Sequence, residues 1–580
     1  MKNDVFLENP VTTEIIRNAL SSAAKEMNES LFRSAFTPII YEMKDCSVGI
    51  FNEKAELLGQ SAGLPIFLGN LEVAINITTE FFGGIDCYHE GDVYILNDSY
   101  LTGTHLNDIT VFSPIFYEGK LVGFTATRAH WLDVGAKDPG YPMDATEIYQ
   151  EGVRIPPLKL MDRGILRDDV ANLLCKNSRF YRAAMGDLHA QIAACKTGER
   201  RFAEIIKKFG FETVERSIHD IFLQSELMER EAVASIPNGV YYAEGCIDND
   251  GRSDESVMVK LKLTVKDGKL NIDLSGSSSQ VKGSTNCGIA QTISACRVAY
   301  KQLIHPEAPV TGGCFKPLMV TAPQGSIFTA EEPAACSWYF TSLGLLIDLC
   351  VKALEEAMPD KVAGAHYGDS MVIYFAGTNP RTGVPFLDVE ATVGGWGGFK
   401  ANDGQDALIN SVNGDFKNLP VEVFETNYPM KITKYAIRPD SAGPGKNRGG
   451  DGCIREYESM IDEVYVYLWF ERSKTTAWGV VGGKPGKAPN VIIDTGDKQA
   501  ELLKTSAYRI KKGSKVTCLT GGGGGYGNPF EREPERVLRD CDQGYITREH
   551  ARVEYGVVIT DFGTIDYEET EKVRKLPIKI

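Results

Sequence analysis

The stretch that decides the fold of the N-terminal part is "DITVFSPIFYEGKLVGFTATRAH", residues 108–130. Two runs rich in β-branched and aromatic residues flank Glu118-Gly119, and this pattern predicts a β-hairpin. Counting outward from the turn places residue 108 opposite residue 129 and residue 107 opposite residue 130. A β-bulge would shift this register by one position. The ends of the two strands are therefore expected to meet.

These strand ends carry side chains that can bind a metal ion. His105 and Asp108 stand three residues apart in "GTHLND", where a turn leads into the first strand, and His130 ends the second strand. Asp45, just before the strand pattern "CSVGIF", is a further carboxylate candidate. Two imidazoles with one or two carboxylates suit Zn²⁺ or Mn²⁺, and a set without cysteine, left partly open, favours a catalytic role. The alternative is that His130 is an ordinary half-buried histidine.

Helical and strand patterns alternate along the rest of the chain. Residues 9–36 have apolar positions at helical spacing, which predicts one long helix capped by Thr12 or Thr13. The fold class expected is α+β (mixed α/β) with several subdomains. Its N-terminal block combines β-hairpins with long helices, and its middle and C-terminal parts are β-rich. The domains expected are 1–235 (metal-binding α+β), 236–365 (mixed sheet and helix), 366–520 (β and loops) and 521–580 (a glycine loop and a C-terminal helical segment).

Size and charge narrow the classes of protein. The chain has 580 residues, which at about 150 residues per domain predicts three or four domains. The formal net charge of −16 argues against partners such as nucleic acid or an anionic membrane. No targeting segment and no apolar run of about 18 residues is visible, so no membrane span is expected. The 13 scattered cysteines without a CxxC pattern indicate reduced thiols, so we expect a cytoplasmic protein.

Several long motifs resemble one known family. They are "NDSYLTGTHLNDITVFSPIF", "TRAHWLDVG", "ATEIYQEGVRIPP", "GDLHAQIAAC" and "LTGGGGGYGNP". Their order and spacing are similar to those of the hydantoinase B/oxoprolinase family over about residues 10 to 560. That family holds the B-type subunits of ATP-dependent hydantoinases, 5-oxoprolinases and caprolactamase. The alpha-type subunits of acetone and acetophenone carboxylases are more distant relatives.

The resemblance implies a metal site and a partner. The ligands that it implies are Asp45, His105, Asp108 and His130. Two positions depart from the family pattern: Cys46 stands where an aromatic residue is common, and Ala136 where a second glycine is common. The implied partner is an A-type subunit that binds ATP and Mg²⁺ and phosphorylates the carbonyl oxygen of the substrate.

The function predicted from this resemblance is that of a B-type subunit of an ATP-dependent cyclic amide hydrolase. In a hetero-oligomer, one divalent metal ion (Zn²⁺ or Mn²⁺) on this chain would promote ring opening, with Glu42 or Asp133 as general base. One alternative is a subunit of a ketone carboxylase of the acetone or acetophenone type. Another is a metal-binding scaffold without chemistry of its own.

Other motifs carry weaker signals. The chain has no Walker A sequence, and "GGGGGYG" at 521–527 matches GxGxxG only formally, so a structural turn or subunit contact is favoured over phosphate binding. Nucleotide binding is therefore expected on the partner alone. Ser61 in "GQSAG" lacks the helix that a nucleophile elbow needs. The loops "AHYGDSM" (366 and 369) and "GPGKNRGGDG" (448 and 451) are open to pocket, interface or simple turn roles.

Overall fold

The computed structural model describes residues 9–575 and divides the chain into two compact units. The first unit comprises Met1–Tyr242, Lys260–Leu343 and Val412–Lys417, and the second Ala243–Val259, Gly344–Ser411 and Asn418–Ile580. This division is discontinuous in sequence. The four continuous domains expected from the sequence remain a prediction.

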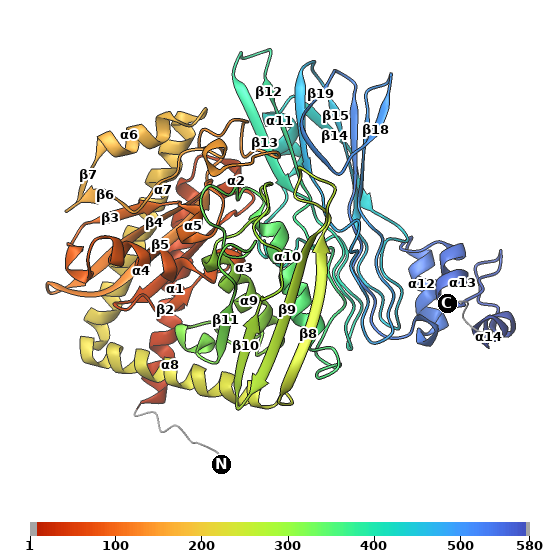
Figure 1. Ribbon diagram of the computed structural model, residues 1–580, viewed down its shortest axis with the longest axis horizontal. Helices are drawn as coiled ribbons and strands as arrows, with labels where there is room; N and C mark the ends of the chain where they lie inside the picture. Colours follow the sequence, from red (N-terminus) through yellow and green to blue (C-terminus); the bar gives the residue numbers. More distant parts are fainter. Residues whose placement is uncertain (1–8, 576–580) are drawn as a thin grey trace. The chain divides into compact units, whose positions relative to one another are not determined.

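A seven-stranded sheet forms the centre of the first unit (Figure 1). Its strand order is β2-β1-β5-β4-β3-β6-β7. The 108–130 hairpin supplies β4 and β5, so it lies in the middle of the sheet. The strands are β1 (Cys46–Asn52), β2 (Leu57–Gln60), β3 (Val93–Leu96), β4 (Asp108–Tyr117), β5 (Lys120–His130), β6 (Leu158–Asp162) and β7 (Ile165–Leu166).

The register of the hairpin includes a bulge. Asp108 pairs with His130, and the bulge lies between Ile115 and Phe116. Symmetric counting placed residue 108 opposite residue 129, so the bulge shifts the register by the one position that the sequence left open. As a result the first residue of β4 and the last residue of β5 stand side by side.

Both faces of this sheet are covered because its strands alternate between two hydrophobic clusters. Val93 and Ile95 of β3 pack with residues of α6 and α7, whereas Tyr94 and Leu96 pack with residues of α4. The helices are α1 (Pro10–Ser34), α2 (Pro38–Tyr41), α3 (Pro65–Leu68), α4 (Leu71–Phe81), α5 (Ser99–Thr102), α6 (Asp168–Lys176), α7 (Tyr181–Phe209), α8 (Phe211–Ala234) and α9 (Ile289–Leu303).

A second sheet has the order β11-β10-β9-β8, and helix α10 (Tyr339–Ala353) continues from the first unit into the second. Strands β9 and β10 form an antiparallel hairpin in which Lys266 pairs with Lys269. The strands of this sheet are β8 (Gly239–Ile247), β9 (Val257–Lys266), β10 (Lys269–Asp273) and β11 (Leu318–Thr321).

The second unit contains two antiparallel sheets, a short helix α11 (Val421–Asn427) and three C-terminal helices. One sheet has the order β13-β12-β16-β19 and the other β14-β15-β20-β17-β18. The strands are β12 (Val372–Thr378), β13 (Pro385–Ala391), β14 (Met430–Ile437), β15 (Cys453–Ser459), β16 (Val464–Trp469), β17 (Asn490–Asp494), β18 (Gln499–Glu501), β19 (Lys504–Ile510) and β20 (Lys515–Leu519). The helices are α12 (Pro534–Asp542), α13 (Arg548–Tyr555) and α14 (Tyr567–Lys575).

The glycine run 521–525 is buried in the second unit among other extended glycine segments. The Gly523 N–H donates to the Gly450 carbonyl oxygen at 2.9 Å, and the Gly443 N–H donates to the Gly523 carbonyl oxygen at 2.7 Å. A Cβ atom on Gly523 would lie 2.0 Å from the Trp396 carbonyl oxygen. The run is therefore a structural element whose backbone groups are bound by backbone, which agrees with the structural role favoured from the sequence.

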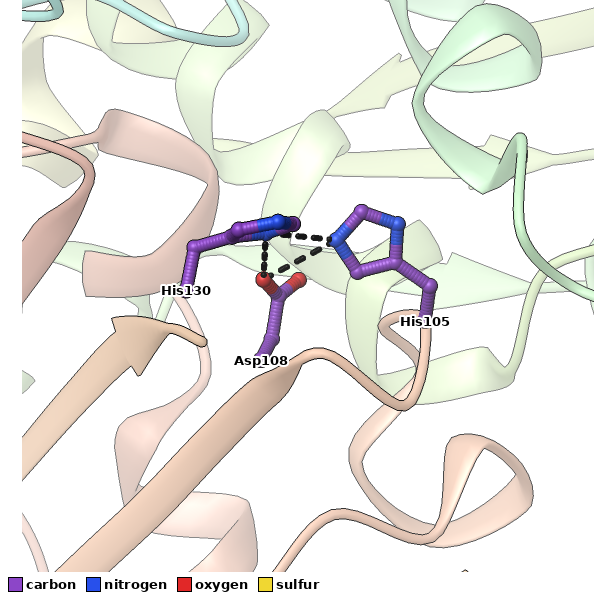
Figure 2. Close-up of side chains that lie close together, drawn as sticks. All are labelled: His105, Asp108 and His130. Atoms are coloured by element: carbon purple, nitrogen blue, oxygen red, sulfur yellow. Dashed lines mark hydrogen bonds and ion pairs between the residues drawn. The ribbon is translucent and has the colours of Figure 1, made fainter. Parts of the chain in front are cut away.

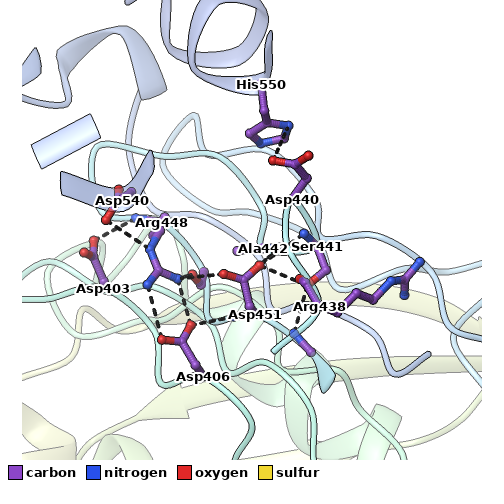
Figure 3. A network of polar contacts seen from close by, with 12 residues as sticks. Asp403, Asp406, Arg438, Asp440, Ser441, Ala442, Arg448, Asp451, Asp540 and His550 are labelled. Carbon is purple, nitrogen blue, oxygen red and sulfur yellow. Dashed lines mark hydrogen bonds and ion pairs between the residues drawn. The ribbon is translucent and has the colours of Figure 1, made fainter. Parts of the chain in front are cut away.

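Charged side chains surround this glycine-rich region (Figure 3). Arg448 pairs with Asp406 at 2.8 Å and with Asp451 at 3.4 Å. Arg532 pairs with Asp403 at 2.7 Å and with Asp540 of α12 at 2.7 Å. These pairs attach the C-terminal helices to the rest of the second unit.

The mixed α+β class predicted from the sequence is confirmed. One detail is wrong: α1 is capped by Asn9, whose side chain accepts a hydrogen bond from the Thr12 N–H, and not by Thr12 or Thr13. Because Pro10 at the first helical position has no N–H to satisfy, the helix begins earlier. Across residues 9–575, none of the helices has the length and apolar character that crossing a membrane requires.

Candidate metal centre

Three side chains converge where the central hairpin ends (Figure 2). Asp108 begins β4, His130 ends β5, and His105 lies on the turn after α5. His105 Nε2, His130 Nδ1 and Asp108 Oδ1 are each 3.0 Å from the other two. All three residues are buried. A short helix and a hairpin thus bring two imidazoles and a carboxylate to one point.

The protons on this triad are restricted by its neighbours. His105 Nδ1 lies 3.0 Å from the Ser337 carbonyl oxygen, and a carbonyl only accepts, so Nδ1 must donate. In the neutral ring, His105 Nε2 then presents a lone pair toward Asp108 Oδ1, which also only accepts. One N–H on His130 cannot satisfy both facing acceptors at full strength. The three inward atoms therefore fit a shared cation better than mutual hydrogen bonds.

Burial and the mutual contacts of the triad shift the pKa of each of its three residues. Burial by itself would raise the pKa of Asp108, but His105 and His130 outweigh it and hold that pKa well below its usual range. Burial lowers the pKa of His130. For His105, the burial that lowers the pKa is outweighed by Asp108, so the net shift is upward. The ionised Asp108 and the neutral His130 suit a divalent ion, whereas His105 would release its Nε2 proton when it binds one.

Asp45 lies close to the triad but outside its tight group. The main-chain N–H of His130 donates to the main-chain carbonyl oxygen of Asp45 at 3.1 Å. In the side chain of Asp45, Oδ1 is buried without a hydrogen-bond partner among the described residues. Burial and then the charge of Asp108 raise its pKa well above the usual value. A buried carboxylate oxygen that receives no hydrogen bond could serve, after Asp108, as a second carboxylate ligand of a cation. The fourth expected ligand is therefore near, although it is not one of the three mutually contacting groups.

Aromatic rings enclose the triad and one of them binds it. The Tyr339 hydroxyl donates to Asp108 Oδ2 at 3.0 Å. The ring of Tyr141 lies 4.8 Å from that of His105 and 5.6 Å from that of His130, measured between centroids. These rings limit the mobility of the imidazoles and keep the surroundings apolar, which strengthens electrostatic interactions in the site.

Glu151 is a residue whose role the sequence analysis missed, although it lies in the quoted motif "ATEIYQEGVRIPP". Its Oε1 accepts hydrogen bonds from the Cys336 and Ser337 N–H groups, both at 2.8 Å. Its Oε2 is buried without a hydrogen-bond partner among the described residues, and burial raises its pKa to about 7. Because Ser337 in turn accepts from His105, Glu151 orients a residue of the triad through the main chain.

Arg128 was also missed. It precedes His130 by two positions on β5, so the two side chains lie on the same face of the strand. Arg128 is fully buried. Its Nε donates to Thr110 Oγ1 at 2.8 Å, and its Nη1 donates to Asn70 Oδ1 at 2.5 Å. Its Nη2 has no hydrogen-bond partner among the described residues. A buried guanidinium with an unpaired donor fits an anionic group of a ligand.

The two general-base candidates occupy different surroundings. Asp133 is buried and bound by Arg179, whose Nη1 lies 2.7 Å from Oδ1 and whose main-chain N–H donates to Oδ2 at 2.7 Å. Glu42 is half-buried at the end of α2. Neither is one of the three converging side chains. Their assignment as general base stays a prediction.

The structure shows no activation of the other nucleophile candidates. Ser61 Oγ accepts from Asn28 Nδ2 at 3.2 Å. Cys46 and Cys314 are buried, and burial raises the pKa of both thiols, so neither is held as a thiolate. These residues are packed within the unit.

Comparison with known proteins identifies the family. The profile of the family described as hydantoinase B/oxoprolinase matches residues 9–529. The chain belongs to the hydantoinase B/oxoprolinase family. The region matched includes the seven-stranded sheet, the triad and the glycine run.

Relatives extend over nearly the whole chain. The B-type subunit of a "Putative D-/L-hydantoinase" of Pseudomonas sp. (strain NS671) is 32% identical, with 98% of each chain covered. The crystal structure of the ATP-dependent caprolactamase from Pseudomonas jessenii matches with a TM-score of 0.90 and 29% identity, over 98% of this chain and 100% of that chain. A nucleotide-free acetone carboxylase structure matches with a TM-score of 0.91 over 98% of this chain and 83% of that chain. At 20% identity it shows similarity of fold alone.

Proposed function

We propose that this protein is the B-type subunit of an ATP-dependent cyclic amide hydrolase, and that its triad holds one divalent metal ion, Zn²⁺ or Mn²⁺. The observation that carries the proposal is the convergence of His105, Asp108 and His130, whose three inward atoms lie 3.0 Å from one another in a buried site. Family membership and the relatives named hydantoinase and caprolactamase support the reaction class.

The residues at the ends of β4 and β5 would bind the metal ion. His105, Asp108 and His130 would hold the ion, with Asp45 beside them. A bound divalent ion would act as a Lewis acid toward a carbonyl oxygen or a water molecule.

The neighbouring residues position these ligands. Ser337 and Glu151 fix the tautomer of His105, and Tyr339 fixes the carboxylate of Asp108. Arg128 would face an anionic group of the substrate, such as a phosphoryl group.

A partner would supply the activation step. Amide resonance makes the ring carbonyl a poor electrophile, and phosphorylation of its oxygen removes that resonance. We propose that an A-type subunit with ATP and Mg²⁺ carries out this phosphorylation, because this chain has no Walker A sequence. The letter B in the name of the hydantoinase relative marks that protein as one of several subunits, which supports a hetero-oligomer of this kind.

The test is reconstitution. The chain is co-purified with the A-type protein encoded beside it, its metal content is measured, and cyclic amides are screened for ring opening coupled to ADP release. Ring opening with one metal ion per B chain supports the proposal. Bicarbonate-dependent consumption of a ketone would instead indicate the carboxylase, and a complex active without any metal would refute the metal assignment.

His105→Ala distinguishes a catalytic subunit from a scaffold. We expect the variant to lose most of its metal and at least about 100-fold in turnover, while it still assembles with the partner. His189→Ala, at an exposed histidine of α7, is the matched control and should retain both. Loss of assembly in His105→Ala alone would favour the scaffold.

A further inference from the structure

A second group of chemically competent side chains lies in the second unit, away from the triad in sequence. His366 Nδ1 lies 2.7 Å from Asp348 Oδ1, and His366 Nε2 lies 3.1 Å from Ser411 Oγ. Asp348 comes from α10, whereas His366 and Ser411 come from two loops. All three residues are buried. Three separate segments thus place a hydroxyl, an imidazole and a carboxylate in a row.

The hydrogen bonds of this row have one consistent direction. Asp348 Oδ2 is paired with Arg472 Nη2 at 2.9 Å, and a carboxylate beside a guanidinium accepts hydrogen bonds only. His366 Nδ1 must then donate to Asp348. In the neutral ring, Nε2 carries the lone pair, so the Ser411 hydroxyl donates to it. This is the proton arrangement of a serine poised for activation, in which the hydroxyl proton points at the base that removes it during attack.

Arg472 adds an independent sign of a binding function. Its side chain is only 4% exposed, yet Nε and Nη1 have no hydrogen-bond partner among the described residues. Its backbone φ is +71°, a left-handed conformation that is costly for a residue with a side chain. A buried guanidinium with two unused donors fits an anionic or carbonyl oxygen of a ligand.

We propose that Ser411, His366 and Asp348 form a second, metal-independent acyl-transfer site. Ser411 is the nucleophile, His366 the general base, and Asp348 orients the imidazole. The substrate class is an activated acyl compound, either an ester or an acyl phosphate, whose oxygen atoms would use the free donors of Arg472. This site goes beyond the proposed ring opening, which uses neither Ser411 nor His366.

The reaction balances without any other reagent than water. Ser411 Oγ forms a bond to the acyl carbon while its proton passes to His366 Nε2, and the bond from that carbon to the leaving oxygen breaks. The imidazolium then gives its proton to the leaving group. Water, deprotonated by the same imidazole, attacks the acyl-serine, releases the carboxylic acid and restores the Ser411 hydroxyl. Asp348 remains a carboxylate throughout.

The test is covalent labelling of the full chain with a small fluorophosphonate. Attack by the serine forms a bond from Oγ to phosphorus and expels fluoride, so intact mass spectrometry counts adducts and peptide mapping places them. We expect one adduct, on Ser411. His366→Gln should slow labelling by about 10²–10⁴-fold, the usual contribution of a general base, and Ser411→Ala should abolish it.

Ser441→Ala is the matched control. Ser441 is another buried serine of the second unit. Its Oγ lies within hydrogen-bond distance of the Arg438 carbonyl oxygen, at 2.6 Å, and of Asp451 Oδ1, at 2.9 Å, and not of a histidine. Its replacement should leave the rate of labelling at Ser411 unchanged. The peptide map of the unsubstituted chain decides the matter even if a variant fails to fold. A folded chain that takes up no adduct, or takes it up on another residue, overturns the proposal.

Discussion

A single main-chain carbonyl decides what His105 can do. Because Ser337 occupies Nδ1, only Nε2 can act as a ligand or base, and it points at Asp108 and His130. Ser337 is in turn held in place because its main-chain N–H donates a hydrogen bond to Glu151 Oε1. At the scale of the residue, the candidate centre is therefore defined as much by its hydrogen-bonded neighbours as by its ligands.

Tyr339→Phe tests one such neighbour. The variant removes the hydroxyl that donates to Asp108 Oδ2 and keeps the ring that packs beside His105. We expect the affinity for Zn²⁺ or Mn²⁺ to fall by about 10–100-fold, measured by competition with a chromophoric chelator. Tyr100→Phe is the control, since that hydroxyl donates to the Ala334 carbonyl oxygen instead. Equal affinities in both variants would show that Tyr339 does not position the ligand.

Glu151→Gln tests a buried acid. Burial raises the pKa of Glu151 from 4.5 to about 7, so between these pH values the folded protein keeps a proton that the unfolded chain has lost. The free energy of unfolding of the unsubstituted protein should therefore fall as the pH rises through this window and level off above pH 7.

In Glu151→Gln this dependence disappears. Relative to the unsubstituted chain, the variant should gain about 3 kcal/mol between pH 4.5 and pH 8. Urea unfolding of the metal-free protein at a series of pH values measures the difference. Glu147→Gln, at a neighbouring exposed position, should show no such gain. Parallel pH profiles for Glu151→Gln and the unsubstituted chain would refute the shifted pKa.

At the scale of the element, the glycine run shows how backbone can pack directly on backbone. Four consecutive residues of the run would each place a Cβ atom about 2 Å from a main-chain carbonyl oxygen, and these oxygens come from three neighbouring segments. The oxygens belong to Ser441 for Gly522, Trp396 for Gly523, Trp478 for Gly524 and Pro444 for Gly525. A run surrounded in this way leaves no room for any side chain.

Gly523→Ala should therefore be strongly destabilising. The added methyl group meets backbone that cannot move away cheaply, so we expect a loss of about 3 kcal/mol or more in the free energy of unfolding. Gly496→Ala is the control: its φ is +82° but nothing lies within 4 Å of the added Cβ, so it should cost only about 1–2 kcal/mol. Chemical denaturation measures both. Similar costs at the two positions would mean that the segments around the run can separate.

At the scale of the whole molecule, buried ion pairs join the C-terminal helices to the second unit. Arg532 is only 1% exposed and binds Asp403 and Asp540. Arg532→Ala would leave the buried carboxylate of Asp540 with only the longer contact to Arg448 at 3.7 Å, whereas Asp403 keeps its pair with Arg536 at 2.9 Å. We expect a cost of about 3 kcal/mol, at the lower end for a broken buried pair. We expect the segment beyond residue 532 to become sensitive to limited proteolysis.

Arg509→Ala provides the comparison for this prediction. Arg509 and its partner Glu463 are both more than 60% exposed, so their pair should contribute at most about 1 kcal/mol. Its removal should leave the proteolysis pattern unchanged. If Arg532→Ala is as resistant as Arg509→Ala, the C-terminal helices are held by their hydrophobic contacts and not by this pair.

Local features of this protein could be predicted from its sequence. Strand alternation and a turn predicted the 108–130 hairpin, and a hairpin brings its two ends together, so local pattern alone could place residues 25 positions apart in one patch. Helical periodicity likewise predicted the long helices α1 and α7, while the first-turn proline moved the cap of α1 to Asn9. Asp45 followed from its position just before a strand pattern and again from the family motifs, and its carbonyl oxygen accepts a hydrogen bond from the main-chain N–H of His130.

Features that depend on distant segments could be seen only in three dimensions. The bond from His105 to Ser337 spans 232 residues and that from Tyr339 to Asp108 spans 231, and no periodicity relates such positions. The same holds for the row of Ser411, His366 and Asp348, and for the enclosure of the glycine run. Hydrogen bonding and desolvation depend on which groups meet in space, and local sequence pattern carries no information about that.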